Sequence, residues 1–224
     1  MSDTDSFIDE VNEEVRRDRL YAYFRRYGWI ALVVIIAVVG GAAWNEYRKN
    51  EAEAQAQALG DDLLNAMRQN EAEQRAADLS LITADTPGGN AIVEFSLAAA
   101  QAESGQTDAA VAALNNIATQ GDLPEIYRQI AAFKALTLQT ETLPVEERRI
   151  GFEALAVAGA PLRLLAEEQL ALLSVESGDA QAAIERFQSI LQDAEATADL
   201  QQRAAQAIVA LGGTPERRPE TQQG

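Results

Sequence analysis

The sequence predicts an all-α protein in which one N-terminal transmembrane helix precedes a solenoid of helical hairpins. Three observations predict this fold. Residues 27–45 contain no charged side chain, and residues 90–211 show helical periodicity without the alternation that a strand produces. Two segments of the second half, residues 97–117 and 170–190, also repeat each other.

Residues 27–45, with the sequence YGWIALVVIIAVVGGAAWN, form the predicted membrane anchor. A bilayer core about 30 Å thick requires roughly 20 mostly apolar helical residues, and this stretch is just long enough. Trp29 and Trp44 bracket it, as aromatic residues do at membrane interfaces. We assign the anchor to residues 29–45. Its expected transmembrane side chains are Trp29, Ile30, Leu32, Val33, Val34, Ile35, Ile36, Val38, Val39 and Trp44.

The basic residues on the two sides of this segment predict its orientation. Five arginines precede it and only Arg48 and Lys49 follow closely. Because cytoplasmic flanks carry the excess of Lys and Arg, we expect the N-terminus in the cytoplasm. With a short charged tail and an alanine-rich composition, we expect a single-pass protein of the bacterial inner membrane with a periplasmic C-terminal domain. The arginines are Arg16, Arg17, Arg19, Arg25 and Arg26.

Two other interpretations of the apolar segment stay open. A cleaved signal peptide could end at Gly41-Ala42-Ala43, but the long acidic segment before it differs from the short basic start of a secretory signal. A buried core helix would ordinarily carry a polar stripe, which this segment lacks. An uncleaved anchor explains the pattern best.

Composition excludes several classes of function. The net charge of −17 argues against nucleic-acid binding, which needs a basic surface. The chain contains no Cys and no His, so Cys/His metal sites and nucleophile–base pairs of these residues are absent. No phosphate-binding loop or dinucleotide fingerprint occurs. We therefore expect no enzymatic activity, no catalytic residue, no cofactor and no metal.

Composition and turn residues divide the rest of the chain. Residues 46–82 are rich in strong helix formers and should continue the anchor helix, with a bend at Gly60 and an end at Asn70. A loop is expected over residues 86–90, and a capping box from Asp122 to Glu125. The predicted domains are residues 1–28 (cytoplasmic tail), 29–45 (anchor), 46–82 (helical extension), 90–213 (repeats) and 214–224 (disordered tail). Helices are predicted over residues 71–81, 91–103, 107–119, 124–140, 145–157, 161–177, 180–193 and 197–211.

The internal repeat indicates the architecture. LAAAQAESGQTDAAVAALNNI at residues 97–117 aligns without a gap to LALLSVESGDAQAAIERFQSI at residues 170–190. The separation of Leu97 and Leu170 along the chain corresponds to two units of about 36 residues, and we call this separation the repeat offset. Each unit is close in length to the tetratricopeptide repeat of about 34 residues. Gly105 and Gly178 should end the first helix of each pair in a left-handed conformation. The alternative is an ordinary helical bundle.

The order of these parts resembles a known family. A charged tail (FIDEVNEEVRRDRL), a span ending in WNEYRK, an Ala/Gln-rich helix and degenerate tetratricopeptide repeats are similar to the YfgM-like proteins, ancillary subunits of the Sec translocon. The resemblance implies periplasmic repeats that work with a membrane-anchored chaperone of the prolyl-isomerase type. It also implies a role in protein translocation, acting on exported proteins near the translocon. It carries no catalytic residues.

Two functions compete on the sequence. A membrane-anchored scaffold would bind protein partners in a groove lined by the first helix of each hairpin, unless residues 46–82 fold back into that groove. A structural accessory subunit of another inner-membrane complex would be held mainly by its span, where Ala37 and Gly41 form a small-xxx-small pair. The expected groove residues are Ile92, Phe95, Ala99, Ala102, Tyr127, Arg128, Glu168, Leu172 and Val175.

Overall fold

The computed structural model describes the backbone of residues 3–216, and the side chains of residues 25, 26, 29, 30 and 32–216. This described part is entirely helical, with nine helices and no strand. The chain divides into two compact units, Met1–Ala58 and Leu59–Gly224. The predicted all-α class is therefore confirmed for the described residues.

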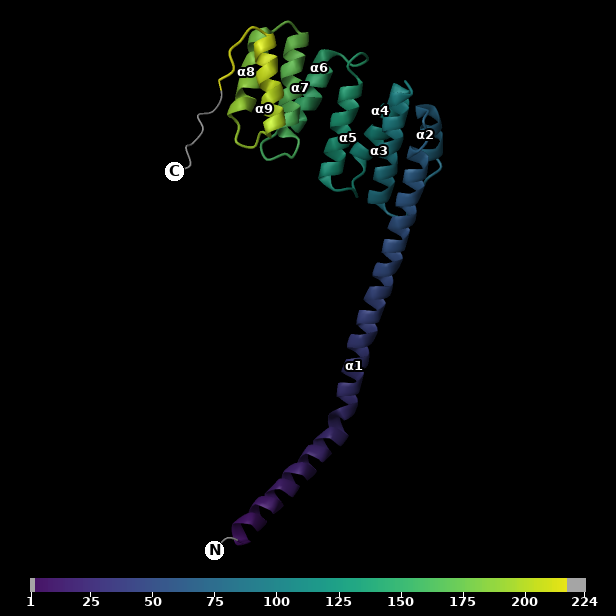
Figure 1. Cartoon of the computed structure of the whole chain (residues 1–224), viewed down its shortest axis with the longest axis vertical. Helices are drawn as coiled ribbons and strands as arrows, with labels where there is room; N and C mark the ends of the chain where they lie inside the picture. The colour runs from purple at the N-terminus through teal and green to yellow at the C-terminus, as the bar shows by residue number, and fades with distance from the viewer. Residues whose placement is uncertain (1–2, 217–224) are drawn as a thin grey trace. The chain divides into compact units, whose positions relative to one another are not determined.

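Helix α1 (Asp3–Met67) makes up the first unit and supplies the first turns of the second (Figure 1). It continues through Gly60 and ends shortly before Asn70. No helix in the described part of the chain is long and apolar enough to cross a membrane. Residues 27, 28 and 31 of the predicted span, and Arg16, Arg17 and Arg19 before it, have side chains outside the described set.

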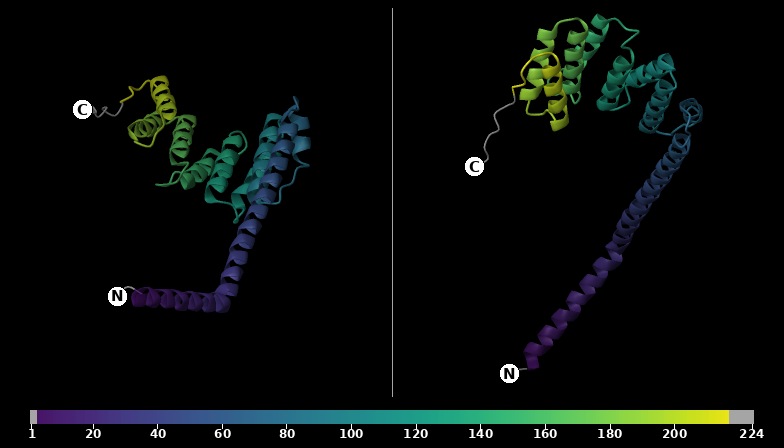
Figure 2. Two further views of the ribbon diagram at one scale, coloured as in Figure 1. Left: turned by 60° about the horizontal axis from the view of Figure 1, so that its bottom comes forward. Right: turned by 45° about the horizontal axis from the view of Figure 1, so that its top comes forward.

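The other helices of the second unit follow one another as antiparallel neighbours. Each helix from α2 to α9 packs on the next one in the chain, which is the contact pattern of a solenoid. Figures 1 and 2 show α2 at one end of this row and α8 and α9 at the other. The bounds are α2 Ala72–Leu79, α3 Pro87–Glu103, α4 Thr107–Thr119, α5 Glu125–Leu138, α6 Val145–Leu155, α7 Arg163–Glu176, α8 Ala180–Gln192 and α9 Ala198–Ala210.

Two local predictions were wrong at helix starts. The segment expected as a loop forms the first turn of α3, because the Thr86 hydroxyl accepts a hydrogen bond from the Gly89 N–H (3.1 Å) and Pro87 fits the first helical turn. The capping box before α5 does not form. Pro124 is the residue before the helix, so Asp122 lies too early to cap it, and Glu125 instead accepts a hydrogen bond from Gln129 (2.8 Å).

The glycine stops have the predicted conformation. Gly105 and Gly178 have φ values of 78° and 80°, in the left-handed region that side chains with a Cβ disfavour. In both turns the N–H of the following residue, Gln106 or Asp179, reaches back to the carbonyl of Gln101 (2.8 Å) or Ser174 (2.9 Å). Each turn is a Schellman motif, so the two first helices end in the same way.

The repeat extends beyond the two segments that first reveal it. Arg75 of α2 and Arg148 of α6 are separated by the repeat offset, and each pairs with a glutamate at the end of the next first helix, Glu103 or Glu176. Buried or core-packed residues continue the same offset from the end of α1 to α9. The equivalent pairs are Leu63 and Leu136, Leu79 and Phe152, Leu114 and Phe187, Ile117 and Ile190, and Ala131 and Ala204.

The same register describes how the hairpins of the second unit follow one another. Residues 59–82 supply a hairpin of their own, because Leu63 and Ala66 of α1 pack with Leu79 of α2 and Ala100 of α3. Two double hairpins follow each other, α1–α4 and α5–α8, and α9 covers the last one through Leu200, Ala204 and Ile208. Single hairpins are equivalent as well, since Ala131 of α5 and Ala166 of α7 occupy the same position and are both fully buried.

Candidate functional site

The residues predicted to line a groove lie on α3, α5 and α7, each of which is the first helix of a hairpin. The end of α1 is the first helix of the hairpin before them. Because a solenoid stacks equivalent residues on one face, the equivalent residues of successive hairpins mark rows that run across these helices. We call the row through Leu172 the apolar row; it consists of Leu64, Ala99, Thr137 and Leu172. The next row consists of Met67, Ala102 and Val175 on α1, α3 and α7, with Thr140 in the turn after α5.

The predicted groove residues separate into exposed and packed sets. Ile92, Ala99, Leu172 and Val175 are exposed, with Leu172 at 46%. Phe95, Ala102 and Tyr127 instead pack against the core cluster of α3, α4 and α5 around Leu114. Arg128 is half-buried.

Glu168 is engaged inside the repeat unit. Its carboxylate accepts hydrogen bonds from Nε and Nη2 of Arg203 on α9, at 2.7 and 2.9 Å. This bidentate pair and Asp199 raise the pKa of Arg203. Glu168 therefore ties α9 to α7 and closes the C-terminal end of the unit.

Two exposed apolar side chains of this face were missed by the sequence reasoning. Leu64 is 60% exposed and Met67 is 53% exposed, although both belong to a hairpin that packs on α3. They lie one hairpin before Ala99 and Ala102. The signal was present in the sequence as the equivalence of Arg75 and Arg148, which places residues 59–82 inside the repeat.

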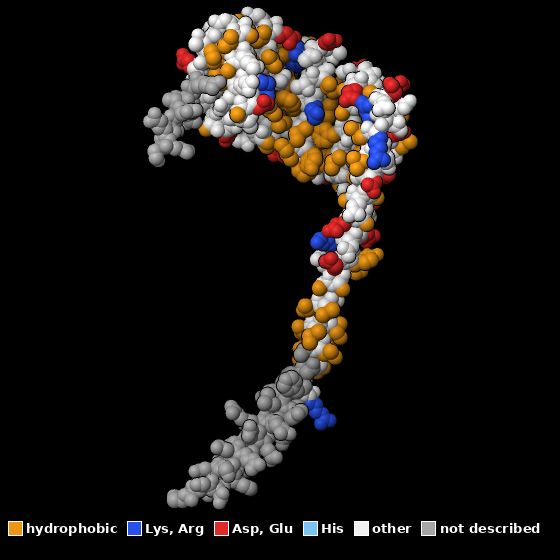
Figure 3. Space-filling view, viewed as in Figure 1, with side chains coloured by type: hydrophobic (Ala, Val, Ile, Leu, Met, Phe, Trp, Pro, Cys, Tyr) orange, Lys and Arg blue, Asp and Glu red, His pale blue; other side chains and the backbone are white. Residues whose placement is uncertain are grey.

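Figure 3 shows hydrophobic side chains exposed over the second unit, gathered most densely over the middle of the row of helices. Charged side chains are scattered around them, with both signs present. Exposed apolar patches bordered by polar residues are typical of protein-binding surfaces.

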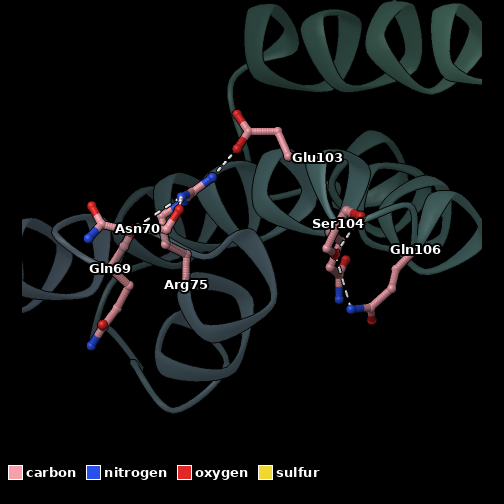
Figure 4. A network of polar contacts seen from close by, with 7 residues as sticks. Gln69, Asn70, Arg75, Glu103, Ser104 and Gln106 are labelled. Carbon is pink, nitrogen blue, oxygen red and sulfur yellow. Dashed lines mark hydrogen bonds and ion pairs between the residues drawn. The ribbon is translucent and has the colours of Figure 1, made fainter.

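The two equivalent arginines form ion pairs between neighbouring helices. Arg75 pairs with Glu103 and also donates to the carbonyls of Gln69 and Asn70, both at 3.0 Å (Figure 4). Arg148 pairs with Glu176 at 2.6 Å and donates to the Leu143 carbonyl at 3.1 Å.

These arginines occupy unusual positions in the repeat. Arg148 is only 2% exposed, at a position where α4 and α8 carry the buried Ala110 and Ala183. The longer turn after α5 supplies the Leu143 carbonyl that satisfies its Nε–H. Both pairs fix an exposed glutamate at the end of a first helix.

The first unit offers an apolar side without described partners in the core clusters. Trp29, Val33, Ile36 and Val39 are each more than half exposed. The rings of Trp44 and Tyr47 stack with centroids 6.3 Å apart, on adjacent turns of the same helix.

The described residues show no arrangement for metal chemistry. No group of three or more His, Cys, Asp or Glu side chains in the described part of the chain could hold a metal ion. Several charged side chains instead form arginine–carboxylate pairs between segments of the repeat, such as Arg163 with Asp193 and Arg186 with Glu167.

A helical-repeat protein with an open face on its first helices is the class that this fold and site define. A family model described as a tetratricopeptide repeat-like domain matches residues 21–147, more than half of the chain. The chain belongs to this family. The matched range includes the apolar segment and the first double hairpin. Neither the curated proteins nor the solved structures contain a match.

Proposed function

We propose that this protein is a membrane-anchored scaffold whose helical repeats bind other proteins. The observation that carries the proposal is the set of exposed apolar side chains at equivalent positions of successive first helices, above all Leu64 and Leu172. A buried apolar side chain would be explained by its contribution to stability. Leu64 and Leu172 are exposed to solvent, so their apolar character needs another explanation. Repeats of this family generally mediate protein–protein interactions. We further propose that the chain has no enzymatic activity.

The anchor rests on the uncharged segment at residues 27–45 and the arginines before it. The sequence carries no charge over roughly the 20 residues that a bilayer core requires, although no described helix meets the length and apolarity of a span. The excess of arginine before it favours an N-terminus in the cytoplasm. The repeats would then lie in the periplasm of a bacterial inner-membrane protein.

A role beside the Sec translocon and its chaperones rests on the resemblance of tail, span and repeats to the YfgM-like proteins. In this role the repeats hold a membrane-anchored periplasmic chaperone or an exported protein close to the export site.

The second candidate is an accessory subunit of another inner-membrane complex, held by its span. In its favour, a Cβ at Gly40 or Gly41 would meet nothing within 4 Å, so a partner helix could approach there closely. In this case the repeats would be a spacer.

Affinity purification of the full-length chain in mild detergent, followed by mass spectrometry, tests the proposal. Three forms are compared: the natural chain, Leu172→Gln, and a chain whose residues 27–45 are replaced by an unrelated span. We expect translocon or chaperone components with the natural chain, and loss of the repeat-bound proteins in Leu172→Gln. If only the span replacement abolishes capture, the accessory-subunit function replaces the scaffold.

A further inference from the structure

The apolar row continues onto helix α1. Leu64 is 60% exposed and lies one hairpin before Ala99, while Leu172 is 46% exposed and follows Ala99 by the repeat offset. Larger apolar side chains therefore stand at the two ends of the row. Between them, Ala99 and Thr137 are small and leave room for the side chains of a partner.

Four residues further on from the apolar row, three of the four equivalent positions carry carboxylates, Glu103, Glu141 and Glu176. The fourth position carries Arg68, directly after α1, and all four residues are exposed. Arg75 and Arg148 each contact one oxygen of Glu103 or Glu176, and these two glutamate side chains remain 62% and 45% exposed. The arginines are the buried members of the pairs, so the carboxylates face solvent.

The wider charge of the unit has the same sign. Acidic residues outnumber basic ones more than twofold over residues 59–216. Six of the arginines there are already paired with carboxylates of the same unit, and Lys134 of α5 is an exposed cation close to Thr137. A net negative field over an apolar row attracts cations that also carry apolar side chains.

We infer that the docking surface begins on α1 at Leu64 and takes a basic segment of a partner protein whose apolar side chains seat on the apolar row. This inference rests on the proposed scaffold function and names the chemistry of its partner.

The test uses defined peptides and the full-length chain in nanodiscs of zwitterionic lipid, with empty nanodiscs as the blank. The probe is a fluorescent decapeptide of alternating leucine and lysine. One analogue carries glutamate in place of lysine, and another carries serine in place of leucine. Fluorescence anisotropy gives the Kd of each peptide.

Matched variants locate the site. Leu64→Gln and Leu172→Gln should each weaken binding of the leucine–lysine peptide about tenfold, because each removes an apolar contact that buries a leucine of the peptide. Ile150→Gln is the control, because Ile150 is 61% exposed but lies on the second helix α6. Circular dichroism verifies that each variant is folded.

The outcomes separate this inference from the scaffold function. Tenfold weaker binding of both analogues, with Ile150→Gln unchanged, supports the inference. Equal binding of the glutamate peptide, or equal losses in Ile150→Gln and Leu64→Gln, overturns it. If no peptide binds while purification still captures repeat-bound proteins, the inference fails and the scaffold function stands. If purification captures none but the peptides bind at the row, the scaffold function fails.

Discussion

Glu94 lacks the arginine partner that its equivalent in the second double hairpin has. Its equivalent at the repeat offset is Glu167, which pairs with Arg186 at 2.8 Å. The residue equivalent to Arg186 is Ala113, so Glu94 has no such cation. Its Oε2 is buried without a hydrogen bond, and its Oε1 accepts only a long bond from Asn116 (3.4 Å). Burial raises the pKa of Glu94, and the bond from Asn116 opposes this rise.

Replacing Glu94 with glutamine should increase the free energy of unfolding at neutral pH. Because its pKa is raised in the folded chain, the folded state binds this proton more tightly, and stability falls as pH rises from 4.5 through the folded pKa. Urea unfolding between about pH 4 and 8 should show a flatter pH dependence in Glu94→Gln.

The partner substitution controls this prediction. Ala113→Arg should supply the missing cation and also raise the urea midpoint at pH 7. A lower urea midpoint in both Glu94→Gln and Ala113→Arg would contradict the prediction that the charged Glu94 carboxylate destabilises the folded state.

The buried arginine predicts unequal effects at equivalent glutamates. Glu176→Gln leaves the guanidinium of Arg148 charged at 3% side-chain exposure, which should lower the free energy of unfolding by about 1–3 kcal/mol. Glu103→Gln is the matched control, since Arg75 is more exposed and keeps two backbone acceptors. Equal urea midpoints for Glu176→Gln and Glu103→Gln would contradict the prediction that the more deeply buried arginine depends more on its glutamate.

At the level of helices, two glycines inside helices have opposite surroundings. A Cβ at Gly151 of α6 would lie 2.7 Å from Cδ1 and Cδ2 of Leu136 on α5, whereas a Cβ at Gly60 of α1 would meet nothing within 4 Å. Gly151 therefore lets α5 and α6 approach closely, in a hairpin whose turn is longer than the others.

Alanine at these two positions should act in opposite directions. Gly60→Ala should stabilise the chain by up to about 1 kcal/mol through helix propensity. Gly151→Ala should destabilise it, because overpacking of about 1–3 kcal/mol exceeds that gain. The shift in Tm of each variant is the measurement. A rise in both would mean that Leu136 moves aside freely.

The last hairpin carries a second prediction at this level. Ala183 is fully buried and Phe187 is 2% exposed, in one cluster with α9. Phe187→Ala should lower the free energy of unfolding by about 3–5 kcal/mol, and Ala183→Leu by about 1–3 kcal/mol. Val209→Ala, at a position 60% exposed, is the control and should leave the urea midpoint nearly unchanged.

At the level of the whole molecule, the distribution of arginine predicts topology. A reporter that is active only in the periplasm should be active when fused after Gly224, because five arginines before the uncharged segment favour a cytoplasmic N-terminus in the proposed topology. Intact protein should also keep Met1 or Ser2. A mature N-terminus near Trp44 would indicate a cleaved signal peptide, and a silent reporter would reverse the orientation.

Much of the helical order was available from the sequence, because helix starts and stops are local chemistry. Gly105 and Gly178 could be predicted as helix stops because each follows the apolar periodicity of a first helix, and glycine adopts the left-handed conformation of such a turn at little cost. The start of α3 was misjudged because Thr86 and Pro87 serve equally well in a loop or as a cap. In the structure the first turn of α3 also lies close to α1, since a Cβ at Gly89 would be 3.2 Å from Cδ2 of Leu59, a contact that the local sequence does not reveal.

By itself, the sequence determined the helical class, the long internal repeat and the uncharged segment at residues 27–45, because periodicity and charge are read without contacts. Only the tertiary structure decided that residues 59–82 join the repeats, that Phe95 and Tyr127 pack inward, and that Leu64 stays exposed. The reason is physical. An amphipathic pattern shows that a face must be buried, but which neighbour buries it depends on the stacking of hairpins far apart in the chain.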